Sequence, residues 1–62
     1  EPQYSIFIED IARNLKPAHE LGMKTVWIIN DEPWASKFSN SSFINYKTDN
    51  LSKFLKEINE SR

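Results

Sequence analysis

The stretch FIEDIARNLKPAHELGMKTVWI, residues 7–28, carries the pattern that decides the fold. It starts inside an apolar run over residues 4–8 and ends inside a second apolar run over residues 24–30. Near-continuous apolar runs are typical of strands that are buried on both faces of a parallel sheet. Between the runs, Gly22 stands where a residue in the left-handed conformation closes a helix. The stretch therefore predicts a strand, a helix and a second strand.

Pro17 indicates where this helix begins. Proline is accepted in the first turn of a helix, because its missing N–H has no intrahelical partner to lose there. We therefore expect the regular helix to begin at Asn14 or Leu15, with Asn14 as its N-cap. Residues 10–13 are then a turn between the first strand and the helix.

The rest of the chain predicts a loop, a short strand and a final helix. Residues 31–42 have loop composition, residues 42–46 favour a third strand, and Thr48 or Asp49 is the expected cap of the last helix. Its apolar residues follow the spacing of an amphipathic helix: Leu51, Phe54, Leu55 and Ile58. Because crossovers between parallel strands are right-handed, we expect an α/β fold with parallel strands in the order β-α-β-loop-β-α.

Length and composition limit how the chain is stabilised. A chain of 62 residues forms one domain at most, and it buries only about 60% of the surface it exposes when unfolded. With no Cys and with His19 as the one His, disulfides and a His/Cys zinc site are excluded. We therefore expect residues 1–62 to be a single unit that self-associates or belongs to a longer protein. The early start of the first strand favours a piece cut from a longer protein.

Charge and hydropathy exclude two classes of partner. The formal net charge of −1 and the scattered lysines give no electrostatic reason to expect nucleic acid. No apolar run reaches the ~18 residues of a membrane span, and no basic-then-apolar leader opens the chain, so we expect no membrane partner. The lack of Cys is consistent with a reducing compartment. These features predict a cytoplasmic location.

Two adjacent carboxylates, Glu9 and Asp10, stand where the first strand ends. Neighbouring negative charges make each other harder to ionise, although a surface turn tolerates them because water screens the pair. An acidic residue before a helix also satisfies free N–H groups and the helix dipole, as it would in a non-catalytic α/β association module. In open α/β sheets, however, ligands bind at the carboxyl ends of the strands. A cation bound at this strand end would offset the repulsion between the two carboxylates, so the pair also predicts a cation site.

One family with such a pair is the receiver domain of two-component signalling, whose first strand ends in acidic residues that bind magnesium. A receiver also needs a phospho-accepting Asp after a later strand, and the candidates here are Asp31 and Asp49. Asp31 follows the strand that corresponds to the receiver's second rather than its third, and Asp49 lies at a helix cap. Pro17 also fits the receiver's long first helix poorly.

Residues 7–28 more closely resemble the last motif region of the haloacid dehalogenase superfamily. That region has an apolar strand, an acidic pair, a short turn, a helix that ends in Gly-Met, and a second apolar strand. Asp10 stands twelve positions before Gly22, which is the family's habitual interval, and the Asn14-Leu15 pair is most similar to the pyrimidine nucleotidase-like branch. Ile11 replaces the Ser of many relatives. Residues 42–58 are similar to the family only in pattern.

The resemblance implies the C-terminal part of a Rossmann-like core and a Mg²⁺-dependent phosphatase of small phosphorylated metabolites, with a nucleotide monophosphate as the first guess. It implies that Asp10 is a direct metal ligand, that Glu9 is a direct or water-mediated one, and that Asn14 is a candidate substrate contact besides a cap. The chain has no DxDx(T/V) nucleophile motif, so we expect it to be inactive alone. The strand at residues 4–8 is then an open edge, which self-associates or pairs with the missing N-terminal part.

Overall fold

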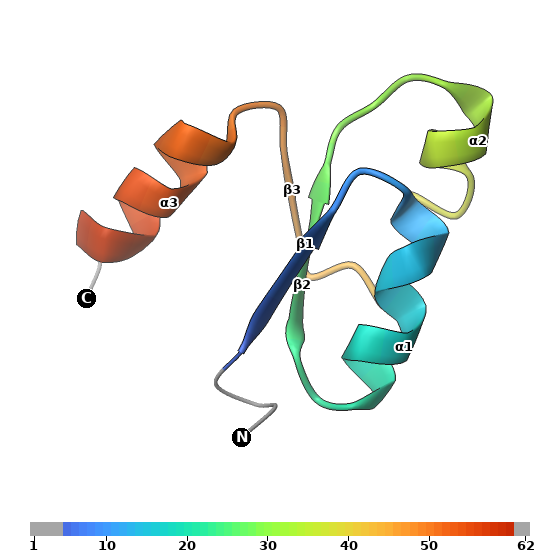
Figure 1. Cartoon of the computed structure of the whole chain (residues 1–62), viewed down its shortest axis with the longest axis horizontal. Helices are drawn as coiled ribbons and strands as arrows, with labels where there is room; N and C mark the ends of the chain where they lie inside the picture. Colours follow the sequence, from blue (N-terminus) through green and yellow to red (C-terminus); the bar gives the residue numbers. More distant parts are fainter. Residues whose placement is uncertain (1–4, 61–62) are drawn as a thin grey trace.

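The computed structural model describes residues 5–60 and shows a three-stranded parallel sheet with helices on both sides (Figure 1). In chain order the elements are β1 (Ile6–Glu9), the 3-10 helix η2 (Ala12–Asn14), α1 (Leu15–Glu20), β2 (Lys24–Ile28), α2 (Pro33–Ser36), β3 (Tyr46–Thr48) and α3 (Leu51–Glu60). The strand order is β1-β2-β3, and both neighbouring pairs are parallel. The predicted α/β class with parallel strands is confirmed. Tyr4, which was expected to begin the first strand, lies outside the described residues.

The end of α1 follows the prediction made from Gly22. The backbone N–H of Gly22 donates to the His19 carbonyl at 2.9 Å, and that of Met23 donates to the Ala18 carbonyl at 3.1 Å. These two bonds form a Schellman motif, which places the residue after the helix in the left-handed region. Gly22 has φ 91°, a value that costs glycine little because it has no Cβ. Pro17 lies in the first turn of α1, also as predicted.

The helix α1 begins at Leu15, as predicted, but its first turn is not capped in the expected way. Residues 12–14 form a 3-10 helix that runs directly into α1, so the expected turn at residues 10–13 is partly helical. Asn14 has helical backbone angles, φ −72° and ψ −9°, and its side chain makes no capping hydrogen bond. A capping side chain requires an extended backbone to reach the N–H groups of the first turn. Asn14 therefore occupies the predicted N-cap position, but its side chain does not cap the helix.

The core lies between the sheet and α1. Ala12 and Leu15 are fully buried, Trp27 is 5% exposed, and Phe43 and Ile44 pack against this cluster. Trp27 comes from the central strand β2, and the first two come from the η2–α1 segment. The core therefore joins the predicted strand-helix-strand unit to a segment that follows it by about fifteen residues.

The third strand begins later than predicted. It covers Tyr46–Thr48 rather than residues 42–46, and it pairs with β2 from the register Val26↔Tyr46 onward. The segment before it is held to β2 by both side chain and backbone. The buried Thr25 hydroxyl donates to the Phe43 carbonyl and accepts from the Asn45 N–H at 3.0 Å, and this N–H also donates to the Thr25 carbonyl at 3.2 Å. The Asn45 side-chain oxygen in turn accepts the Thr25 N–H at 2.9 Å. These bonds hold residues 43–45 beside β2, directly before β3 begins.

Two further local predictions need correction. The expected loop at residues 31–42 contains α2, which begins at Pro33 because proline suits the first position of a helix. The cap of α3 is Asn50 rather than Thr48 or Asp49, since the Asn50 side-chain oxygen accepts the Lys53 N–H at 2.9 Å. The Thr48 hydroxyl instead accepts the Asn50 N–H at 3.1 Å.

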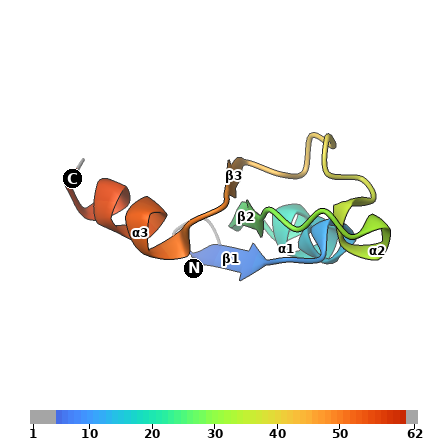
Figure 2. The same ribbon diagram turned by 90° about the horizontal axis from the view of Figure 1, so that it is seen from above.

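The helices cover the two faces of the sheet incompletely at β1. Seen from above, α1 and α3 lie on opposite sides of the sheet, and α3 extends away from it (Figure 2). The Tyr46 and Phe54 rings make contact with centroids 5.7 Å apart, while Ile6 stays 43% exposed and Phe7 37% exposed. The expectation that β1 is buried on both faces is therefore wrong for the chain by itself, because the neighbours Ile6 and Phe7 point to opposite faces and both are exposed. No helix among residues 5–60 combines the length and hydropathy needed to cross a bilayer.

We expect Thr25→Val to destabilise the fold by about 1–3 kcal/mol, because it removes the buried donor of the Phe43 carbonyl and one of the two acceptors of the Asn45 N–H. Thr25→Ser keeps the hydroxyl and should cost only about 0.8 kcal/mol for the lost methyl. Urea unfolding followed by tryptophan fluorescence measures both variants. A Thr25→Val variant as stable as the wild type would contradict this role of the hydroxyl.

We also expect the chain to self-associate through the open edge of β1, because an unprotected apolar edge recruits a further strand. Phe7→Lys places a charge on that edge and should shift the sedimentation profile toward monomer. Leu21→Lys is the matched control, since Leu21 is 67% exposed and lies after α1. Monomeric wild-type protein at high concentration would refute the expectation.

Candidate functional site

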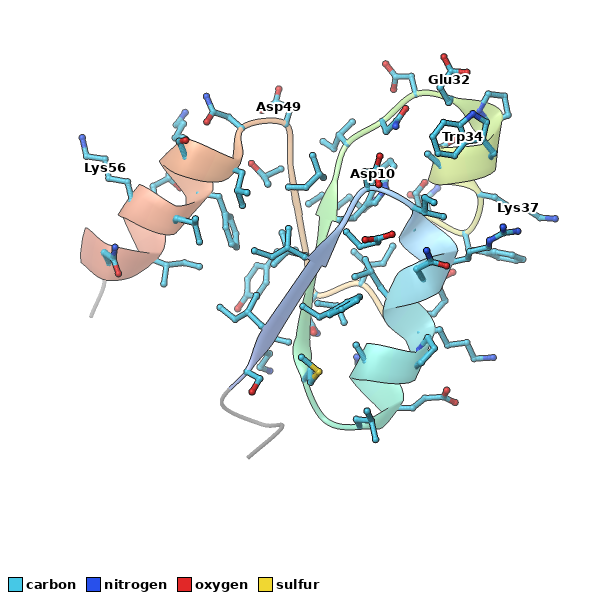
Figure 3. The ribbon with its side chains drawn as sticks, in the orientation of Figure 1. Asp10, Glu32, Trp34, Lys37, Asp49 and Lys56 are labelled. Carbon is cyan, nitrogen blue, oxygen red and sulfur yellow. The ribbon has the colours of Figure 1, made fainter. Side chains whose placement is uncertain are left out.

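The candidate site lies at the edge of the sheet where β1 and β2 end. The two strands are parallel, with Glu9 opposite Trp27, so the residues that follow them emerge at the same edge. Figure 3 shows Asp10 at the bend after β1, beside the chain that leaves β2. This is the end of a parallel sheet at which α/β proteins bind ligands.

The main chain of Asp10 is held by the core. The Trp27 indole N–H donates to the Asp10 carbonyl at 2.7 Å, and Trp27 is almost completely buried. Two residues further on, Ala12 is fully buried against the same indole cluster. The carboxylate of Asp10 is exposed, so an accessible acidic group stands on a backbone that has little freedom.

Each carboxylate of the pair has its own amide partner. Asn30 Nδ2 donates to Asp10 Oδ2 at 3.3 Å, and the Asn30 side-chain oxygen accepts the Glu32 N–H at 3.0 Å. Asn14 Nδ2 donates to Glu9 Oε1 at 3.0 Å. The half-buried Glu9 is therefore directed toward the start of α1, while Asp10 is directed toward the chain that leaves β2.

The sequence-predicted residues are brought together in part. Glu9, Asp10 and Asn14 all lie around the end of β1, and the Asn14 side chain, at the N-cap position, donates to Glu9 instead of capping α1. Asn30 was missed, although its position directly after the second predicted strand places it at the same sheet edge as Asp10. Asp49, a candidate in the receiver interpretation, follows β3 and is separated from β1 by the whole of β2.

The donor chemistry fits a hard cation. Mg²⁺ usually takes one or two carboxylates from a protein and keeps several waters, and Asp10 and Glu9 are two such groups with one oxygen each left free of the amides described above. Within the described part of the chain, no three His, Cys, Asp or Glu side chains are grouped to hold a metal ion. Asp10 fits a direct ligand, and Glu9 fits a group that acts through water.

The aromatic residues and the one His are distributed over several parts of the fold. Trp27 is in the core. His19 is half-buried on α1. Trp34 on α2 and Phe38 after it are each 54% exposed. Phe38 also has φ 67°, a left-handed conformation that is unusual for a bulky residue.

Comparisons of the chain with protein-family models, with curated proteins and with solved structures gave no match.

We expect weak Mg²⁺ binding, with a dissociation constant of roughly 1 mM, because water must supply most of the ligands. Titration followed by amide NMR shifts should locate the changes at residues 9–14 and 30–32. Asp10→Asn should abolish these shifts, whereas Asp49→Asn, the same change after β3, should leave them. Shifts of equal size in both variants would contradict a site at Asp10, and tight binding would mean that further ligands complete it.

Proposed function

We propose that this chain supplies the acidic metal-binding part of a Mg²⁺-dependent hydrolase of the haloacid dehalogenase type. The observation that carries the proposal is the exposed Asp10 carboxylate at the carboxyl end of a parallel strand, on a main chain held by the Trp27 indole. The substrate class is a small phosphorylated metabolite, with a nucleotide monophosphate as the first candidate. A cytoplasmic location belongs to the same proposal, because the sequence has no Cys.

The residues at the edge have separate tasks in this proposal. When bound, Mg²⁺ neutralises and orients a phosphoryl group. Asp10 offers the ligand oxygen, and Asn30 limits the rotation of its carboxylate through the bond to Oδ2. Glu9 adds a second negative charge beside it, and Asn14 holds Glu9 in place. A donor such as Asn14 would also suit a phosphate oxygen, which keeps it as a candidate substrate contact.

The nucleophile must come from outside this stretch of sequence. No DxDx(T/V) motif occurs in the 62 residues, and the resemblance places the nucleophile strand beside the strand that carries the acidic pair. The open edge of β1 supports this, because a further parallel strand paired there would end at the same sheet edge as Asp10. An aspartate at its end would then face the metal.

A non-catalytic association module is the alternative, and a specific observation favours it. Large apolar side chains are exposed along β1 and α3: Ile6, Phe7, Leu51 and Leu55. Apolar surface of this kind marks interaction sites. A receiver-like phosphorylation fragment is less well supported, because Asp49 is separated from Asp10 by a strand.

The reading frame upstream of Glu1 and a pair of activity assays test the proposal. We expect an upstream DxDx(T/V) motif, and we expect no turnover of p-nitrophenyl phosphate by residues 1–62 alone, since the nucleophile is absent. In the longer protein, Asp10→Asn should lower kcat by at least about a hundredfold through the loss of transition-state charge stabilisation.

Asp49→Asn in the longer protein is the control and should leave kcat unchanged. Hydrolysis by residues 1–62 that Asp10→Asn abolishes would overturn the assignment. So would normal activity and unchanged magnesium dependence of the Asp10→Asn enzyme. A reading frame that encodes no nucleophile motif would favour the association module.

A further inference from the structure

A groove separate from the acidic pair lies between the η2–α1 segment and the loop before β3. It has a volume of about 470 Å³ and is lined by Arg13, Lys16, Phe38, Ser41, Ser42 and Phe43. Pockets of about 300–1,000 Å³ are the usual size for small-molecule sites. The two cations and two hydroxyls of its lining can donate hydrogen bonds to an anion, and the two aromatic rings can contact the organic part of such a ligand.

The groove is positively charged in a chain whose net charge is −1. Arg13 and Lys16 are three positions apart on consecutive helical segments, so they point to the same side. No Asp or Glu lines the groove. Within residues 5–60 neither cation has a carboxylate partner, so both are available to an anion. A guanidinium and an ammonium beside hydroxyl groups are well suited to phosphate oxygens.

The aromatic wall of the groove is held in a strained conformation. Phe38 adopts φ 67° while its ring stays 54% exposed. A left-handed bulky residue costs on the order of 1–3 kcal/mol, and burial in the described chain recovers little of this. The Ser39 N–H donates to the Ser36 carbonyl at 2.9 Å and the Ser41 N–H to the Phe38 carbonyl at 3.1 Å, so the turn is well held.

Two further contacts shape the site. The Lys37 ammonium lies 5.4 Å from the centroid of the Phe38 ring, so a third cation is close to this aromatic side chain. Lys47 Nζ donates to Asn40 Oδ1 at 3.0 Å and fixes the loop to β3. On the inner side, Phe43 packs against the core and gives a firm apolar surface. Little rearrangement is therefore needed to admit a planar group.

We propose that this groove binds a small aromatic phosphate. The phosphate lies between Arg13 and Lys16 with the Ser41 and Ser42 hydroxyls as further donors, and the ring lies along Phe38 and Phe43. Aromatic rings pair favourably in stacked or edge-to-face contact, and this interaction uses the exposed Phe38 ring. The groove shares no residue with the acidic pair, so the inference does not rest on the proposed hydrolase function.

Two probes distinguish the sources of such a ligand. Phenyl phosphate represents aryl phosphates, and adenosine 5′-monophosphate represents nucleotides. Both are titrated into the 62-residue protein by amide NMR in EDTA at low ionic strength, with inorganic phosphate and adenosine as partial ligands. We expect both aromatic phosphates to bind at residues 13–16 and 38–43 more tightly than either partial ligand, and the tighter of the two identifies the source. Binding should weaken with added salt.

Matched variants test each part of the groove. Arg13→Gln and Lys16→Gln should each weaken binding about tenfold, the loss of one charge-assisted hydrogen bond. Lys53→Gln on α3 is the control and should bind as the wild type does. Phe38→Gly should remove the advantage of the aromatic phosphates over inorganic phosphate. It should not lower the thermal midpoint, because glycine adopts φ 67° without steric cost, which offsets the freedom it adds to the unfolded chain.

Several results would overturn the inference. These are no shift with either aromatic phosphate, equal binding of inorganic phosphate, or equal loss of binding in Lys53→Gln. Asp10→Asn separates this inference from the proposed hydrolase function. It should leave binding in EDTA unchanged, because the acidic pair contacts a phosphate only through a metal ion. A loss of binding in that variant would overturn the inference that the groove binds independently of the acidic pair.

Discussion

The hydrogen bond from the Trp27 indole to the Asp10 carbonyl, at 2.7 Å, is the contact on which the rest of the structure depends. An indole N–H buried without a partner costs about 1–3 kcal/mol, and Trp27 lies in the central strand at 5% exposure. The end of β1 must therefore come to the indole. With the end of β1 in that position, Ala12 and Leu15 pack in the same buried cluster as Trp27, and α1 lies against the sheet.

This contact also separates the structural part of the acidic pair from its exposed part. The backbone of Asp10 serves the core while its carboxylate faces outward, where Asn30 meets it from the end of β2. Such a division is useful for binding, because a ligand group on a constrained backbone loses little conformational freedom when it engages. The groove between the η2–α1 segment and the loop before β3 has a similar division, since Phe43 packs on the core while Arg13 is exposed.

The two faces of the sheet differ in how complete they are. The face toward α1 holds the buried cluster around Trp27, whereas the face toward α3 leaves Ile6 and Tyr46 largely exposed (Figure 2). A chain of this size has little core to stabilise it. The apolar side of α3 and the open edge of β1 are therefore the surfaces on which added contacts would stabilise the fold most.

The sequence by itself determined the features that depend on neighbouring residues. The apolar runs around β1 and β2, the helix end at Gly22, the place of Pro17 in the first turn, and an acidic pair at the end of a strand all follow from local rules, and the structure contains them. Hydrophobic period and backbone preference act over a few residues, so they can be read without a fold. The start of β3 could not be read in this way.

Tertiary structure decided the features that depend on residues far apart in the chain. Thr25 and Asn45 exchange hydrogen bonds across twenty positions, and the regular strand β3 begins only after them, at Tyr46. Asn30 becomes a site residue only because β2 ends beside β1. Asn14 is a side-chain partner of Glu9 because the segment before α1 is already helical. Each of these outcomes depends on which polar groups come into hydrogen-bonding distance once the chain is folded. The spacing of residues in the sequence does not show which distant groups do so.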